Sequence, residues 1–376
     1  MEGVTIETPD APETPARTRL SRQRKFGFAF LAATLAGAIG LALIPAPYVI
    51  EMPGPVYDTL STVQDADGQD VSLISIDGAD TYPTEGTLSL LTVYVGGSPD
   101  DHPSWLDVVS AWFRPDYAVI PMDLIYAPGT THQDEVDASA IQMSNSQQEA
   151  VAAALTSLGI SYESQIVVEE PMKGYPAEGK LENGDIILSA NGVPVANVSD
   201  LRALIKDIGV GGSIDIEFER GGVAKTVSLG IVASGQDNST PVIGVYTSGK
   251  YIFPFDVTIQ LSNVGGSSAG MMFALGIIDE LTPGALNGGA KVSGTGEITA
   301  AGEVGRIGGI VQKAYAARDS GAEWILLPSG NCDDLYGNVP DGIREVPVDT
   351  LDDALAALKA IKAGTGDESL PHCPAP

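Results

Sequence analysis

The pattern of apolar and polar residues predicts one long apolar helix near the amino terminus, followed by groups of strands and helices. Residues 26–44 contain no charged side chain. As a helix they would be about 28 Å long, close to the thickness of the hydrocarbon core of a bilayer. A cleaved signal peptide usually has a shorter apolar region, and Pro45 and Pro47 make a poor cleavage site. We therefore predict a retained transmembrane helix over residues 26–44.

The residues ahead of this helix predict its orientation. Basic side chains gather directly before it, at Arg17, Arg19, Arg22, Arg24 and Lys25. Because such clusters stay on the cytoplasmic side, everything after residue 47 is expected outside the cell membrane. The Pro-, Thr- and acid-rich start predicts a disordered cytoplasmic leader over residues 1–25.

Between residues 48 and 159 the pattern is that of a β-rich segment closed by one helix. Residues 87–95 are rich in β-branched and apolar side chains. Ser146, with Glu149 three residues later, has the spacing of a capping box, and the next apolar residues keep one face. A helix is thus predicted to begin at Ser146 and to end at Gly159.

Two further units are predicted after this helix. Residues 160–232 show short strands at 166–168, 184–188, 214–218 and 226–229, and a helix at 198–208. Residues 250–362 predict strands at 257–261 and 324–328 and helices at 267–278 and 350–362, and a tail follows at 363–376. The fold class is α+β.

Composition excludes several classes of function. The formal net charge of -29, from 49 acidic and 20 basic residues, would repel nucleic acid. The three histidines lack the spacing of metal ligands, so no metal site is expected. The two cysteines, Cys332 and Cys373, form no Cys-x-x-Cys pair. A disulfide between them and two free thiols both remain open.

Two adjacent serines precede the predicted helix at 267–278. Ser267 could cap this helix through its hydroxyl. Alternatively, the small neighbours Gly266 and Ala269 let a substrate backbone approach Ser268, and free N–H groups at the helix start stabilise an oxyanion. The serines by themselves favour the cap.

Motifs further along the chain favour the second interpretation. Gly-Glu-Ile-Thr, Ile-Gly-Gly-Ile and Lys-x-x-Ala-Ala occur between residues 296 and 317, in this order after Ser-Ala-Gly. This series resembles the proteolytic domain of Lon-type serine proteases. The resemblance implies Ser268 as nucleophile and Lys313 as its base. It also implies that the Thr295 hydroxyl positions the lysine, with Gly266, Ser267 and Ala269 in supporting roles.

A lysine acting as a base must be neutral, although the reference pKa of lysine is about 10.4. Burial disfavours the ammonium form, and Ile310, Val311 and Ala314 provide apolar neighbours. No carboxylate lies one helical turn from Lys313. Taken alone, Lys313 would fit an ordinary surface position on an amphipathic helix. The surrounding motifs favour its role as a base instead.

Residues 180–195, with Leu-x-x-Gly-Asp-Ile-Ile and Asn191-Gly192, resemble the PDZ domains of bacterial envelope proteases. Such domains take an extended peptide as an added strand. A Gly-Leu-Gly-Phe loop is not found, so a structural spacer remains an alternative. Met143-Ser-Asn-Ser resembles a helix start that Lon-type domains place ahead of their serine, which would make residues 48–159 the first part of the Lon-like domain.

The chain from residue 25 resembles membrane-anchored PDZ and Lon-like proteins of Gram-positive bacteria. We expect an ATP-independent serine endopeptidase without a cofactor, because no P-loop sequence occurs. The expected partners are protein or peptide substrates, the cell membrane through residues 26–44, and a possible second copy of the chain in a homo-oligomer. A non-catalytic, membrane-tethered peptide-binding adaptor and a protease that cleaves only itself are the alternatives.

Overall fold

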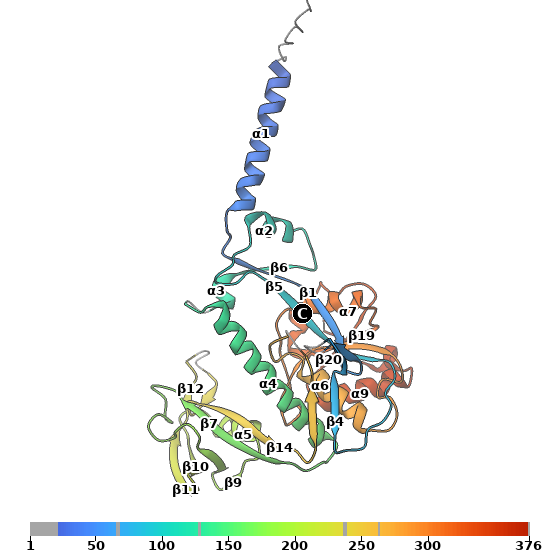
Figure 1. The fold of residues 1–376 in the computed structure, drawn as a ribbon. Coiled ribbons are helices and arrows are strands. Elements are labelled where there is room, and N and C mark those ends of the chain that lie inside the picture. The colour runs from blue at the N-terminus through green and yellow to red at the C-terminus, as the bar shows by residue number, and fades with distance from the viewer. Residues whose placement is uncertain (1–21, 65–67, 127–128, 236–238, 262–263, 375–376) are drawn as a thin grey trace, which may run out of the picture.

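The computed structural model of the chain describes residues 22–64, 68–126, 129–235, 239–261 and 264–374 (Figure 1). Most of the predicted leader, including Arg17 and Arg19, lies outside these residues. The apolar segment forms α1 (Arg22–Leu43), which projects away from the rest of the molecule with Phe26, Phe28 and Phe30 exposed. By length and composition, α1 could span a membrane.

The first of two six-stranded sheets combines strands from both halves of the chain. Its order is β20 (Arg344–Val348), β19 (Trp324–Pro328), β16 (Lys291–Gly294), β5 (Thr87–Gly96), β1 (Tyr48–Asp58) and β6 (Ala118–Pro121). The β1 strand pairs antiparallel with both β5 and β6, whereas β16 lies parallel to β5 and to β19. One sheet is therefore built from residues before and after the segment that contains the second sheet.

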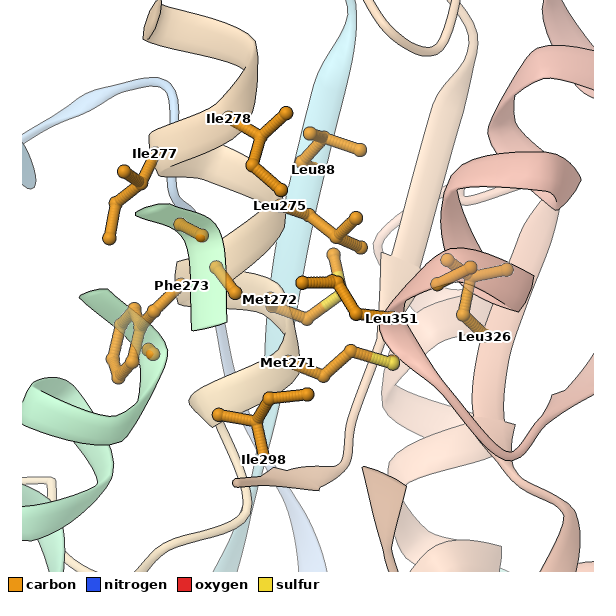
Figure 2. Close-up of a cluster of buried hydrophobic side chains, with 14 of the residues drawn as sticks. Leu88, Met271, Met272, Phe273, Leu275, Ile277, Ile278, Ile298, Leu326 and Leu351 are labelled. Atoms are coloured by element: carbon orange, nitrogen blue, oxygen red, sulfur yellow. The ribbon is translucent and has the colours of Figure 1, made fainter. Parts of the chain in front are cut away.

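Helices cover both faces of the first sheet. Alternate residues of a strand point to opposite faces of the sheet. Leu90 of β5 packs in one core with α6 (Gly270–Leu281) and α9 (Leu351–Lys362). The next residue, Leu91, packs in a second core with α7 (Ile310–Asp319). Figure 2 shows the first core, where α6 side chains such as Met272 and Leu275 lie beside Leu88 and Leu351.

The helix α4 (His132–Ser157) begins earlier than predicted. Thr131 and Asp134 form its capping box. Ser146 is buried in mid-helix, where its hydroxyl donates to the Ser267 carbonyl at 2.9 Å. The predicted start at Ser146 was wrong because its partners, like those of Glu149, come from distant parts of the chain and not from the helix terminus.

The second sheet has the order β11 (Val223–Gly230), β10 (Ser213–Arg220), β8 (Ile186–Ala190), β7 (Glu163–Pro171) and β14 (Val245–Ile252). The helix α5 (Val198–Ile208), predicted with these bounds, packs on it through Leu201 and Ile205. The strand β14 lies at the sheet edge, beyond the predicted domain boundary at residue 232. In Figure 1, α4 runs between this unit and the first sheet.

The remaining elements are short. The strand β4 (Ile74–Asp77) pairs with β15 (Asp256–Ile259), and β17 (Glu297–Ile298) pairs with β18 (Val304–Gly305). The short strand β9 (Val193–Pro194) pairs with β8 and belongs to the second sheet. The others are β2 (Thr62–Gln64), β3 (Asp70–Ser72), α2 (Trp105–Ala111), α3 (Met122–Ile125), β12 (Val232–Ala233), β13 (Pro241–Val242), η1 (Ser329–Asn331), α8 (Cys332–Leu335) and α10 (Gly366–Ser369).

A disulfide joins Cys332, at the start of α8, to Cys373 in the tail, with a sequence separation of 41. Closing a loop of this length stabilises a fold by about 2–4 kcal/mol, chiefly through the unfolded chain. We expect Cys332→Ser with Cys373→Ser to lower the free energy of unfolding by that amount. Denaturant unfolding measures it, and the reducing agent that destabilises the wild type should leave the double variant unchanged.

Candidate active site

Ser268 lies in the turn that leads into α6, and its side chain is partly exposed. The Ser268 carbonyl accepts hydrogen bonds from the Gly296 N–H at 2.8 Å and from the Thr295 hydroxyl at 3.0 Å. A Cβ atom on Gly270 would lie 2.7 Å from Ile298 and 2.8 Å from the Ser146 hydroxyl. The turn is thus held in place by its own carbonyl and by the close approach of α6 to its neighbours.

Lys313 reaches the same turn from the helix on the opposite face of the sheet. Its Nζ lies 2.8 Å from the Ser268 Oγ and 3.1 Å from the Thr295 Oγ1. Lys313 is 2% exposed, and Thr295, directly after β16, is fully buried. The structure therefore brings Ser268, Thr295 and Lys313 together at the end of β16.

The Thr295 hydroxyl fixes the direction of these hydrogen bonds. A hydroxyl has one proton, and Thr295 donates it to the Ser268 carbonyl. Its oxygen is then an acceptor for a proton on the Lys313 Nζ. One N–H of the lysine is accordingly directed at Thr295, and the remaining positions on Nζ are available to the Ser268 Oγ.

Burial lowers the pKa of Lys313 from its ordinary value of 10.5 to about 8. The carboxylates of Glu51 and Glu297 act in the opposite direction and raise it. Burial in turn raises the pKa of Glu51, which lies on β1. A substantial fraction of the amine is thus neutral near pH 8.

The two carboxylates near Lys313 were not predicted from the sequence. The expectation covered only positions one turn away on the same helix, whereas Glu51 and Glu297 come from β1 and β17. Glu297 lies within the Gly-Glu-Ile-Thr motif, which was a usable signal. Nothing in the sequence around Glu51 indicates that β1 passes the lysine.

Ser267 does not cap α6. The helix begins three residues later than predicted, with Ala269 at the N-cap and no side-chain cap. The Ser267 hydroxyl instead donates to the Glu297 carboxylate. Gly266 has a φ of +88°, a conformation that favours glycine, and its N–H donates to the Ser139 carbonyl at 3.0 Å. Both residues shape the turn.

The N–H groups at the start of α6 are partly used. Gly270 donates to the Ser267 carbonyl at 3.3 Å, and Met271 donates to the Gly296 carbonyl at 3.0 Å. Within the described part of the chain, the N–H groups of Ser268 and Ala269 have no protein acceptor. In the same part of the chain, no cluster of three His, Cys, Asp or Glu side chains could hold a metal ion.

Comparison with known families identifies two domains. Residues 263–360 match the Lon protease (S16) C-terminal proteolytic domain, and this range contains all three residues of the cluster. Residues 141–218 match the PDZ domain family. The chain therefore contains a Lon-type proteolytic domain together with a PDZ domain.

Relatives support the same assignment over parts of the chain. The archaeal Lon protease of Methanothermobacter thermautotrophicus is 29% identical over 198 residues, which are 51% of this chain and 29% of that protein. The Lon protease of Azospirillum brasilense is 40% identical over 93 residues, 24% of this chain and 11% of that protein. The chain thus matches less than a third of the length of either relative.

Among solved structures, the PDZ domain of the SdrC-like protein from Listeria monocytogenes is similar, at 23% identity and a TM-score of 0.21. The matched region covers 22% of this chain and 85% of the solved PDZ domain.

Proposed function

We propose that this protein is an ATP-independent serine endopeptidase, with Ser268 as the nucleophile and Lys313 as the general base. The observation that carries the proposal is the 2.8 Å distance between the Lys313 Nζ and the Ser268 Oγ, at a lysine that is 2% exposed. Buried amines with a lowered pKa activate hydroxyl nucleophiles, and the Lon-type domain gives this pair its context.

In the neutral form, the Lys313 Nζ accepts the proton of the Ser268 hydroxyl while one of its N–H groups stays on Thr295. The serine oxygen attacks the substrate carbonyl, and the N–H groups of Ser268 and Ala269 are the candidate donors to the resulting oxyanion. The ammonium of Lys313 then gives its proton to the leaving amine. This returns the lysine to the neutral form and leaves an acyl-enzyme.

Hydrolysis of the acyl-enzyme uses the same groups in reverse. Lys313 takes a proton from water, the hydroxide attacks the ester carbonyl, and the proton returns to the Ser268 oxygen as it leaves. In both steps the Lys313 Nζ exchanges its proton with the serine oxygen on one side and with the leaving amine or the attacking water on the other. A single base is therefore sufficient for both steps.

The setting that we propose is the outer face of a cell membrane, with α1 as a single-pass anchor and the amino terminus in the cytoplasm. The apolar length of α1 supports the anchor. The disulfide between Cys332 and Cys373 supports an oxidising compartment for the catalytic part. The substrates would be extracytoplasmic proteins or peptides, which the PDZ unit helps to recognise.

The test is the cleavage of an unfolded protein by the purified full chain in detergent without ATP. Ser268→Ala should lower the rate by about 10⁴-fold or more. Ser110→Ala, a surface serine on α2, should keep the wild-type rate. Equal rates for wild type and Ser268→Ala would refute the proposal, and peptide binding without cleavage would identify an adaptor.

A further inference from the structure

Two grooves meet on the flank of the PDZ unit. The first, here called the α5 groove, lies between α5 and the first half of β14, with Leu201, Arg202 and Ile205 opposite Gly244, Val245 and Thr247. The second, here called the junction groove, lies between the PDZ unit, α4 and the Lon-type domain. Val198, Arg202 and Thr247 line both grooves, so the two are continuous.

The junction groove reaches the Lon-type domain close to the turn that contains Ser267 and Ser268, here called the catalytic turn. Glu297 and Thr299 of the Lon-type domain line it together with Gly249 and Tyr251 of β14. The Glu297 carboxylate accepts the hydrogen bond of Ser267, the residue directly before Ser268. The continuous groove thus leads from the edge of β14 to Glu297, the hydrogen-bond partner of Ser267.

A carboxylate on α4 holds the two walls of the junction groove together. Glu149 accepts a hydrogen bond from the Tyr251 hydroxyl at 2.7 Å, and its second oxygen accepts the Ala300 N–H. Tyr251 belongs to β14, and Ala300 follows the strand that carries Glu297. This contact fixes the edge of β14 relative to the catalytic turn.

The charges along the two grooves indicate the direction in which a bound chain runs. Among the described residues that line the α5 groove, Arg202 is the one charged side chain, and the rest are apolar or neutral. Arg202 also lines the junction groove, but there the two carboxylates of Glu149 and Glu297 outweigh its charge. A negatively charged carboxyl terminus is attracted toward the α5 groove and repelled from the junction groove. A chain added to β14 therefore has its terminus near Gly244 and its preceding residues toward Tyr251.

We propose that the two grooves form one track, in which the PDZ unit holds the free carboxyl terminus of a substrate and the Lon-type domain cuts the same chain at a fixed distance upstream. This inference rests on the proposed endopeptidase function. An extended peptide advances about 3.3 Å per residue. Following the edge of β14 from Gly244 to Tyr251 and then reaching Ser268 places the cut on the order of ten residues from the terminus.

Photocrosslinking tests the track without catalysis. Ser268→Ala full chain is mixed with peptides of about sixteen residues, each with one benzophenone side chain at a different position. A probe at the last residue should label the β13–β14 loop, and a probe about ten residues upstream should label residues 297–299. Labelling in the reverse order, or labelling of residues 297–299 by no probe, overturns the track.

Cleavage by the wild type then measures the distance. In peptides of increasing length, the cleaved bond should stay at the same distance from the free carboxyl terminus, whatever residues stand on either side of it. Arg202→Ala should lower the cleavage rate on the order of tenfold. Lys206→Ala, which removes a charge from α5 outside both grooves, should have no effect.

Two outcomes separate the track from the proposed function. Cuts at scattered distances would overturn the track but not the endopeptidase function. Correct crosslinks without any cleavage would overturn the proposed function alone.

Discussion

Lys313→Met is expected to abolish proteolysis while making the fold more stable. Methionine fills a similar volume but supplies no base, so the cleavage rate should fall by about 10⁴-fold or more. The protein now buries an amine whose pKa is about 8 and not 10.5. At neutral pH this difference costs about 3 kcal/mol of folding free energy. Removing the amine should therefore stabilise the fold. The gain should be only about 1–3 kcal/mol, because Ser268 and Thr295 lose a hydrogen-bond partner and this loss offsets part of it.

The sign of this stability effect can be checked through pH. Between pH 8 and 10.5 the unfolded chain binds the Lys313 proton and the folded chain does not, so wild-type stability rises across this window. Below pH 8 both states are protonated, and the full cost is present. Thermal unfolding at pH 7 should show a higher Tm for Lys313→Met, and the difference should shrink toward pH 10.5. A lower Tm for the variant at pH 7 would contradict the account.

Glu51→Gln is expected to move the pH dependence of proteolysis toward lower pH. Activity should rise as Lys313 loses its proton, with a midpoint near its pKa of about 8. The Glu51 carboxylate opposes this loss, so its removal lowers the pKa of Lys313 further. At pH 7 the variant should cleave several-fold faster than the wild type, because more of the amine is neutral.

The measurement is the rate of peptide cleavage from pH 6 to pH 10, in a range where the fold is intact by circular dichroism. Glu297→Gln should shift the profile in the same direction, since Glu297 also raises the pKa of Lys313. Glu163→Gln, an exposed carboxylate on β7, is the matched control and should leave the profile in place. A shift of the Glu51→Gln profile to higher pH would show that Glu51 assists the base.

Local sequence patterns predicted the parts of the fold whose contacts are local. The helix α5 and the strand β19 have the predicted bounds because their periodicity reflects a single buried face or a fully buried strand. The two domains were also predicted, through short motifs in the right order. These motifs, and not the spacing of Ser268 and Lys313, led to the candidate pair.

Features that depend on distant contacts could not be predicted from local sequence. The Ser146 hydroxyl was mistaken for a helix cap because its acceptor is a carbonyl 121 residues away, although the true cap of α4, Thr131 with Asp134, has a local signal of the same kind. The strand β14 was left outside the PDZ-like unit because an edge strand has no signal that names its partner. Glu51 and Lys313 meet through the order of strands in the sheet, which no pattern within either segment contains. The disulfide was likewise an open choice between two chemical states.

The strand order of the first sheet determines when β5 can complete its pairing during synthesis of the chain. The strand β5 pairs with β1 on one side and with β16 on the other, and β16 begins only at Lys291. A chain that emerges amino terminus first therefore carries one unpaired edge of β5 while the whole PDZ unit is made and folds. Such an edge favours pairing with other extended chains, so a newly synthesised copy is most prone to aggregate in that interval.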